Sequence, residues 1–430
     1  MAKTTFVAAG DAFITRRLPA GGYPGFQQLK ACIDSHDVKF LNLESTFHDY
    51  EGYPASTSGG TWACSDPRTL DDMKVYGFNI FNTANNHSGD YGIDGVLATI
   101  RNLKERDMVF SGTGSNLAEA SRPCYLDTKY ARVALISCTT AIMNHRAGPQ
   151  TGELKGRPGL NPLRFSQIYH LDPEHFAMAQ KVATASGVNA KQEKSVRNGY
   201  AMPPKAGTLS IGDTKFVLDD RNWVESYPHE KDMQRIEAEI REARLQADIV
   251  LVSIHNHVLD GAENTEVPAF LKTFAHRCID AGAHAMIGHG PHELQGFEIY
   301  NGGLVMYSIG NFIFQTETVQ LQPGDAYDNR NMPLDTKVGA YMDERSAGGT
   351  RGYCVQWPIW NAVLPSWTME DGKLTEVKLY PIDLGMELPR PQKGLPVING
   401  NEETLRYLAK ISEEFGTKFE IKDGVGYICL

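Results

Sequence analysis

The chain has 430 residues, of which 41% are hydrophobic and 22% charged, and its formal net charge is −10. This length can bury one large core, or one large and one small core, and the composition is that of an ordinary soluble globular protein. The negative charge argues against nucleic acid or an anionic membrane surface as the main partner. It still permits a small anionic substrate, because a metal ion would reverse the field locally.

Cysteine usage and the N-terminal sequence both favour a cytoplasmic protein. The seven cysteines are scattered and form no CxxC pair, as expected of reduced thiols. The chain begins MAKTTFVAAGD, a single lysine followed directly by a strand, with no apolar core of a signal peptide. No stretch approaches about 18 continuous apolar residues, so we expect no membrane insertion.

From the N-terminus to residue 138 the pattern alternates between strands and helices. Residues 92–106 carry apolar side chains at helical spacing, and residues 131–137 form a short β-branched run. This order predicts β-α-β units. Residues 143–227 break the rhythm with Gly, Pro, Asn and Lys. We expect them to form an inserted lobe or long loops near the mouth of a site.

In the C-terminal half the apolar residues again recur at the spacing of helices and strands. No linker separates this half from the first. The predicted elements are, in order, helices at 228–247 and 268–282, a strand and turn at 303–314, a loop at 317–352, strands at 353–358 and 374–381, a helix at 402–415 and a terminal β pair. We therefore expect one domain over residues 1–430, with a C-terminal β/helix extension at 353–430.

Five short apolar runs each end on a residue that can bind a metal. The residues at these ends are Asp11, Glu44, Asn86 with His87, His255 with His257, and His289 with His292. In an open α/β sheet the site lies beyond the carboxyl ends of the strands, so these side chains should converge on one pocket. Oxygen and nitrogen ligands without cysteine suit one or two divalent ions, such as Mn, Zn, Fe or Mg.

The motifs around these residues resemble a known family. They are Gly10-Asp11, Asn42-Leu43-Glu44, Asn85-Asn86-His87 with Asp90 and Gly92, His255, GHGPH at 288–292 and SIGNF at 308–312, with GRPGLNPLRF at 156–165 and EIYNGGLVMYSIGNFIF at 298–314. In this order they resemble the CapA/PgsA family of poly-γ-glutamate capsule synthesis, within the calcineurin-like metallophosphoesterase superfamily. The resemblance implies an α/β fold, with a two-sheet β-sandwich flanked by helices and a two-metal site.

The resemblance also implies roles for individual residues. The implied metal ligands are Asp11, Glu44, Asn86, His255, His289 and His292. Glu44 would bridge the two ions; Asn86, His255 and His289 would complete one ion, and His292 the other. The implied catalytic residues are His87, Asp11 and His292, with His87 facing the substrate as general acid or base. Phe13 stands where related phosphatases place a histidine, so we expect the ion held by Asp11, Glu44 and His292 to bind more weakly.

Four further residues are candidates for substrate binding. Arg16 and Arg17 follow Asp11 and can bind a carboxylate or phosphate bidentately, although an ordinary solvated pair is equally compatible with the sequence. His145 lies at the start of the insertion and can line the mouth of the site. His257 is either a further ligand or a residue that supports the ligands.

We expect a metal-dependent enzyme of hydrolase type that uses acid/base chemistry on a peptide-like or γ-glutamyl substrate. Soluble relatives include peptide epimerases, so inversion of the Cα of a C-terminal residue in a ribosomal peptide is the first alternative. A phosphoesterase or a non-catalytic accessory protein of capsule synthesis is the second. The expected partners are a peptide or small anionic substrate and no nucleic acid.

Overall fold

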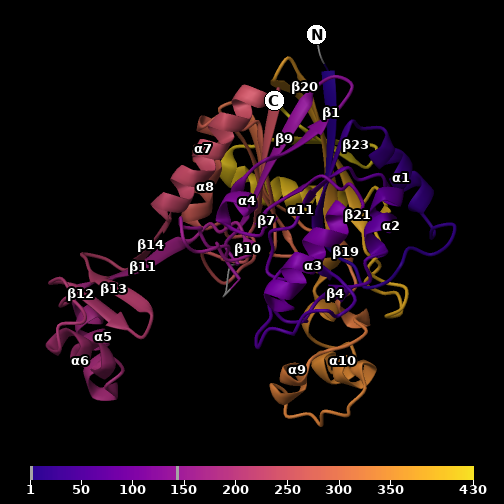
Figure 1. Cartoon of the computed structure of the whole chain (residues 1–430). Helices are drawn as coiled ribbons and strands as arrows, with labels where there is room; N and C mark the ends of the chain where they lie inside the picture. Colours follow the sequence, from indigo (N-terminus) through magenta and orange to yellow (C-terminus); the bar gives the residue numbers. More distant parts are fainter. Residues whose placement is uncertain (1–2, 142–144) are drawn as a thin grey trace.

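The computed structural model describes residues 3–141 and 145–430. Two β-sheets pack face to face, helices cover their outer faces, and two smaller lobes project from this body (Figure 1). This arrangement confirms the predicted α/β class with a two-sheet β-sandwich flanked by helices.

The larger sheet contains the N-terminal strands. Its main path is β23 (Phe419–Lys422), β24 (Val425–Ile428), β21 (Lys373–Asp383), β20 (Asn361–Glu370), β1 (Lys3–Phe13), β2 (Val38–Leu43), β5 (Ile80–Asn82) and β6 (Phe110–Ser111), with β19 (Asn311–Phe314) beside β1 and β22 (Val397–Ile398) beside β21. The strands from β1 to β6 are parallel, whereas β20 runs antiparallel to β1. The carboxyl ends of β1, β2 and β5 therefore meet at one edge.

The second sheet repeats this arrangement. Its order is β17 (Leu294–Tyr300), β18 (Gly303–Ile309), β16 (Ala285–His289), β15 (Ile249–His255), β9 (Arg132–Thr139) and β8 (Cys124–Asp127). Strands β9, β15, β16 and β18 are parallel to one another. Strands β15 and β16 are buried along their whole length, as expected of parallel strands that are covered on both faces.

The central core lies between the two sheets. Phe6 and Phe40 from the larger sheet pack with Leu135, Leu251 and Ile287 from the second sheet. Alternate residues of the same strands point outward and meet the helices. The helices over the larger sheet are α1 (Phe26–Asp34), α2 (Thr69–Tyr76) and α3 (Gly92–Lys104), and those over the second sheet are α7 (Glu230–Gln246) and α8 (Ala269–Asp280). The result is four layers.

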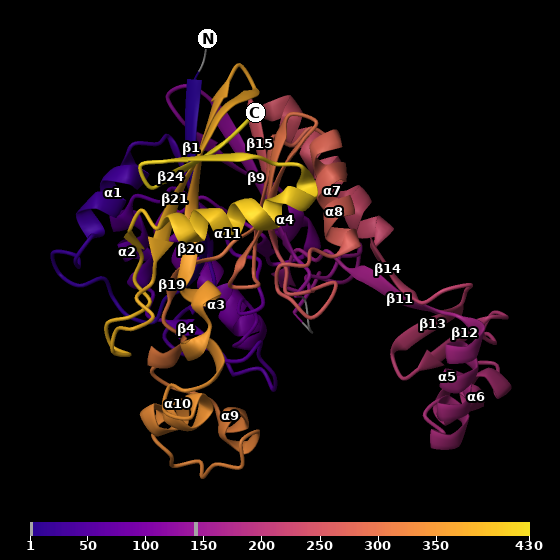
Figure 2. The same cartoon turned by 180° about the vertical axis from the view of Figure 1, so that it is seen from behind.

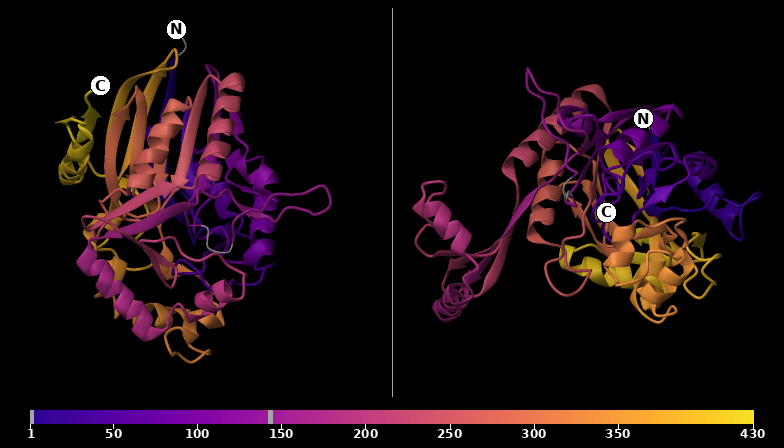
Figure 3. Two further views of the ribbon diagram at one scale, coloured as in Figure 1. Left: turned by 90° about the vertical axis from the view of Figure 1, so that its left-hand side faces the viewer. Right: turned by 60° about the horizontal axis from the view of Figure 1, so that its bottom comes forward.

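An arm projects from the body between Phe165 and Pro228 (Figures 1 and 3). It consists of β11 (Phe165–Leu171), α5 (Pro173–Ser186), α6 (Ala190–Arg197), β12 (Thr208–Ile211), β13 (Thr214–Leu218) and β14 (Trp223–Pro228). The four strands form a separate sheet in the order β12-β13-β11-β14. The arm overlaps the predicted insertion at 143–227 and ends one residue after it, at Pro228; residues 143 and 144 lie outside the described part of the chain.

A second, smaller lobe occupies residues 316–360 and corrects two predictions. Its elements are η1 (Thr316–Thr318), α9 (Gly324–Asp328), α10 (Val338–Ser346), η2 (Gly352–Val355) and η3 (Trp357–Trp360). The predicted loop at 317–352 is wrong because two short helices form there. Helices this short are not stable alone, and the packing of Tyr341 on Tyr327 holds them together. The predicted strand at 353–358 is wrong because Pro358 favours a helical turn, and the indole of Trp360 donates to the carbonyl of Tyr353 at 2.7 Å.

The C-terminal helix α11 (Glu402–Ser412) lies across the edge of the sandwich against β17 and β21 (Figure 2). Within residues 3–141 and 145–430, no helix has both the length and the apolar character needed to cross a bilayer.

Candidate metal centre

The ends of four parallel strands bring the predicted ligands together. Asp11 pairs with Asn42 across β1 and β2, and His255 pairs with His289 across β15 and β16. The two sheets also meet here, because the backbone N–H of Asp11 donates to the carbonyl of Gly310 at 3.1 Å. A Cβ atom on Gly10 would lie 1.8 Å from that carbonyl oxygen, so this crossing requires glycine.

Asp11, His255 and His289 form the first group of candidate ligands, and all three side chains are fully buried. The Oδ1 atom of Asp11 lies 3.6 Å from Nδ1 of His255 and 3.5 Å from Nδ1 of His289. Asn42 donates to Oδ1 of Asp11 at 2.7 Å, and the backbone N–H of Gly290 donates to Oδ2 at 3.1 Å. These bonds fix the carboxylate in place.

Glu44, His257 and His292 form the second group. The Oε1 atom of Glu44 lies 3.8 Å from Nε2 of His292 and 3.6 Å from Nε2 of His255. The Oδ2 atom of Asp11 lies 3.3 Å from Nδ1 of His292. Asp11 and His255 therefore connect the two groups into one cluster, in which His257 is the exposed member.

This grouping differs from the one implied by the family resemblance. His257 joins Glu44 and His292, and Asp11 faces His255 and His289. His255 is the last residue of β15, and His257 follows it in the loop after the strand. Their Nε2 atoms lie 3.0 Å apart. Sequence spacing alone places both residues near the site but does not show which ion each would face.

The donor set fits divalent cations. Both carboxylate oxygens of Glu44 and the Oδ1 atom of Asn86 are buried and have no hydrogen-bond partner among the described residues. Buried oxygens without partners cost free energy, and a cation would remove that cost. The neighbouring donors are imidazole nitrogens and carboxylate oxygens, which suit Zn, Mn, Fe or Mg.

Electrostatics within the cluster also favour cation binding. Burial lowers the pKa of His289 to about 4, against the opposing effect of Asp11, and burial followed by repulsion from His257 lowers the pKa of His255. Both rings are therefore neutral at physiological pH, which is the form that binds a metal. Burial followed by repulsion from Asp11 raises the pKa of Glu44. A cation would reverse that effect and keep Glu44 ionised.

His87 lies beside the cluster, in the turn between β5 and α3, and is held by an acid. Its Nδ1 atom lies 2.7 Å from Oδ2 of Asp90, which also accepts the backbone N–H of Ala63 at 2.7 Å. The edge of Phe13 packs on the ring at a centroid distance of 5.0 Å. Nε2 has no hydrogen-bond partner in the described chain and is not among its fully buried polar atoms. Asp90 thus keeps the proton on Nδ1 and leaves Nε2 able to exchange one.

Asn86 and His145 lie near His87. The side chain of Asn86 packs against Gly59, where a Cβ atom would come within 2.4 Å of Nδ2. The ring of His145 packs against Gly89, two residues after His87. Burial, opposed by the charge of Asp90, lowers the pKa of His145. His145 is therefore close to the turn that carries His87.

The side chains of Arg16 and Arg17 bind other parts of the chain and are not left free at the metal centre. The guanidinium group of Arg17 binds Asp72 in a bidentate pair, with contacts of 2.6 and 2.8 Å. Arg16 donates to the backbone carbonyls of Pro391 and Lys393. These contacts attach the loop after β1 to α2 and to the C-terminal segment. The sequence did not reveal these partners, because they lie far away along the chain.

Two residues that support the cluster are not among the predicted site residues. Asp90 belongs to the Asn85-Asn86-His87 motif and is the partner of His87, and a separation of three residues within a turn is a usable signal for such a pair. Asn311 lies in the SIGNF motif, and its Oδ1 atom is 2.9 Å from Nδ1 of His292. His292 itself has a positive φ of 63°, a conformation that is uncommon for residues other than glycine.

A two-sheet α/β sandwich with carboxylates and histidines at its strand ends defines a candidate metal-dependent protein. The family model for bacterial capsule synthesis protein PGA_cap matches residues 5–316. The chain belongs to this family, which confirms the resemblance to CapA/PgsA proteins.

The relatives differ in how much of the chain they share. The uncharacterized protein y4sH of Sinorhizobium fredii is 32% identical over 440 residues, which cover 99% of this chain and 93% of y4sH. The capsule biosynthesis protein CapA of Bacillus anthracis is 28% identical over 247 residues, which cover 57% of this chain and 42% of CapA. A solved structure described as a "Putative 5'-Nucleotidase from Staphylococcus aureus" has a TM-score of 0.40 and 12% identity, covering 96% of this chain and 58% of that one. That likeness is too distant to support an argument.

Proposed function

We propose that the protein is a metal-dependent enzyme of hydrolase type that acts on a peptide-like or γ-glutamyl substrate, with His87 as general acid or base. The observation that carries this proposal is Glu44, a fully buried carboxylate with two unpaired oxygens that faces His255 and His292. Within residues 3–141 and 145–430 this carboxylate has no hydrogen-bond donor, so a cation is the partner that fits it.

The roles of the residues follow from their positions. Asp11, Glu44 and the neutral rings of His255 and His289 would hold one or two divalent ions, with Asn86, His257 and His292 as further donors. Such an ion would polarise a substrate carbonyl and make bound water acidic near neutral pH. His87 would transfer a proton through Nε2 while Asp90 stabilises the charged ring.

A direct test is to incubate the protein, loaded with Mn²⁺ or Zn²⁺, with γ-glutamyl and α-linked dipeptides. The proposal expects release of free amine that depends on the metal and on His87. A parallel assay with p-nitrophenyl phosphate examines the phosphoesterase alternative. Phosphate release without peptide cleavage would contradict the proposed substrate class.

A peptide epimerase is the second candidate, because the cluster contains two separate acid/base pairs. His87 with Asp90 is one pair, at 2.7 Å, and Asp11 with His292 is the other, at 3.3 Å. Burial alone would lower the pKa of His292, but Glu44 and then Asp11 raise it above its usual value. Epimerisation needs one group to remove the α-proton and another to return it. Incorporation of solvent deuterium at Cα, without cleavage, would support the epimerase over the hydrolase.

A further inference from the structure

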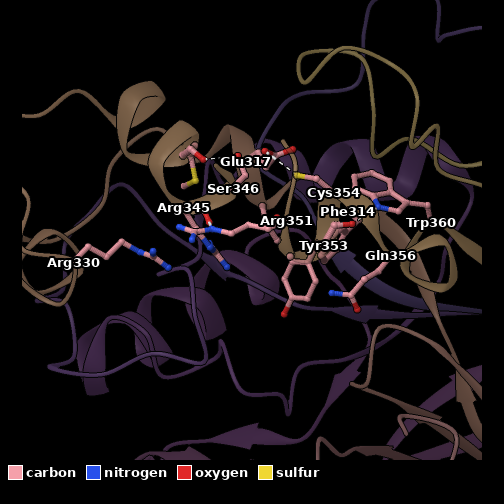
Figure 4. A pocket seen from close by; sticks show the side chains of 13 residues that line it. Phe314, Glu317, Arg330, Arg345, Ser346, Arg351, Tyr353, Cys354, Gln356 and Trp360 are labelled. Carbon is pink, nitrogen blue, oxygen red and sulfur yellow. Dashed lines mark hydrogen bonds between the residues drawn. The ribbon is translucent and has the colours of Figure 1, made fainter. Parts of the chain in front are cut away.

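A cavity of about 260 Å³ is lined by the small lobe and by Phe314 at the end of β19 (Figure 4). Its walls come from β19, η1, α10 and η2, together with Arg330 after α9 and Trp360 at the end of η3. Sites for drug-sized ligands are typically roughly 300–1,000 Å³, so this cavity fits a group the size of one amino-acid residue.

The cavity is positively charged. Arg330, Arg345 and Arg351 contribute to its lining, and Figure 4 shows Arg345 and Arg351 side by side. Among the described residues, none of these three guanidinium groups has a carboxylate within 4.0 Å. Glu317 is the one acidic residue of the lining, and it is neutralised from outside by Arg390 at 3.4 Å and Lys393 at 3.1 Å. An anion that enters would meet uncompensated arginines.

Aromatic rings connect the cavity to the metal centre. The ring of Tyr353 lies 5.8 Å from that of His292, and the ring of Phe314 lies 5.1 Å from it, measured between centroids. Phe314 also packs edge-on against Tyr353 at 5.3 Å and against Trp360 at 5.6 Å. One layer of aromatic side chains therefore separates the cavity from the candidate metal ligand His292.

Arg345 is held by the glycine-rich loop at 57–62, which precedes β4 (Cys64–Ser65), and Arg351 is held by the backbone of α10. Arg345 donates to the hydroxyl of Thr61, and Arg351 donates to the carbonyl of Arg345 at 3.2 Å. Gln322 exchanges hydrogen bonds with the backbone of Trp62 at 3.0 and 3.2 Å. The same loop contacts Asn86 through Gly59. The loop thus contacts both an arginine of the cavity, Arg345, and a candidate metal ligand, Asn86.

We propose that this cavity binds the carboxylate of the substrate residue next to the reacting bond, with its apolar side chain against Phe314, Tyr353 and Trp360. The proposal rests on the proposed function, since it names the substrate class of the same site. Guanidinium groups bind carboxylates through paired, charge-assisted hydrogen bonds, and aromatic walls favour an apolar or aromatic side chain. The preferred substrate is therefore a peptide that ends in a free carboxylate on an apolar residue.

The test is calorimetric titration of the full chain in EDTA with three small probes. They are N-acetyl-L-tryptophan, its uncharged amide N-acetyl-L-tryptophanamide, and phenyl phosphate. We expect the acid to bind at least about tenfold more tightly than the amide, because a charge-assisted pair is lost in the amide. Since EDTA removes the metal, this result is independent of the metal chemistry, and its failure would leave the proposed enzyme class intact.

Two variants locate the binding site. Arg345→Lys keeps the positive charge but loses the planar guanidinium group, which can bind a carboxylate through two hydrogen bonds. Arg351→Gln removes a charge from an exposed side chain. Each should weaken binding of the acid towards that of the amide, whereas Arg406→Gln on α11 should bind as the wild type does. Equal binding of acid and amide, or unchanged binding by both cavity variants, would overturn the proposal. Tighter binding of phenyl phosphate than of the acid would overturn the carboxylate assignment.

Discussion

The rings of His255 and His289 contact each other across neighbouring parallel strands, with their Nδ1 atoms 2.9 Å apart. The Nε2 atom of His289 is held by the hydroxyl of Ser253 at 2.8 Å, so Nδ1 is directed towards Asp11 and His255. Two neutral imidazoles cannot both donate to each other. With both Nδ1 atoms unprotonated, the two rings and the carboxylate of Asp11 would form a cation site, and this relationship underlies the metal assignment.

Replacement of His87 by Ala separates catalysis from metal binding. His87 is held by Asp90 and is not a member of either ligand group, so metal content should stay nearly unchanged. The rate on the true substrate should fall by about 10²–10⁴-fold, the usual contribution of a positioned acid or base. Rate assays and elemental analysis of the same preparation check both parts. Loss of metal in this variant would mean that His87 is a ligand.

The two ions should bind with unequal affinity. The family resemblance places Phe13 where related phosphatases have a histidine, and His257, in the second group, is exposed. Fewer protein ligands leave more water around the ion and weaken its binding. Metal titration should therefore show two unequal affinities or a single ion, and His257→Ala should affect only the weaker one. Two equally tight ions would contradict this account.

Asp232 should make folding stability depend on acid pH. Its carboxylate accepts three hydrogen bonds from Arg164 and one from Arg235, and it joins α7 to the base of the arm. Burial would raise its pKa, but these bonds lower it to about 2. A lowered pKa in the folded state stabilises the protein above the unfolded value near 3.8, and this stabilisation is lost as the pH falls towards 2.

Asp232→Asn should therefore lower the free energy of unfolding by about 2 kcal/mol at about pH 7. The difference from the wild type should shrink between about pH 4 and about pH 2. Urea denaturation at several pH values measures it. The matched control is Asp213→Asn in the exposed turn between β12 and β13, which should change little. A difference that stays constant with pH would show that the ionic contacts of Asp232 are not its cause.

Gly10→Ala should destabilise the fold more than an ordinary glycine substitution. The added Cβ atom would lie 1.8 Å from the carbonyl oxygen of Gly310, where the two sheets meet. Because this contact is with backbone, relief requires strand movement, and we expect a loss of more than about 3 kcal/mol. Gly152→Ala has no atom within 4 Å of its new Cβ and serves as the control. Similar thermal unfolding of the two variants would contradict the predicted close approach.

The layers of sheets and helices, and the cluster of candidate metal ligands, can be predicted from the pattern of apolar residues in the strands. Strands β15 and β16 are largely apolar and buried, as expected of parallel strands that are covered on both faces, and each ends on its candidate ligand. The position of His289 next to His255 then follows from the strand register.

Other features depend on contacts that the local sequence does not reveal. The partner of Arg17 is 55 residues away, and the hydroxyl that binds Arg345 is 284 residues away. Helix α10 has nine residues and is held by tertiary packing, so its segment resembles a loop in sequence. The arginine-lined cavity was therefore not predictable before the fold was known.

Elemental analysis of the purified protein is the most direct test of the central claim, that these residues form a metal centre. After exposure to Mn²⁺ or Zn²⁺ and dialysis, the wild type should retain one or two ions per chain. His289→Ala should lose at least about tenfold in affinity, since a buried ligand is missing. His276→Ala, a partly exposed histidine stacked on Tyr300, should retain the wild-type content. A wild type that retains no ion, or a His289→Ala variant that binds metal as tightly as the wild type, would contradict the account.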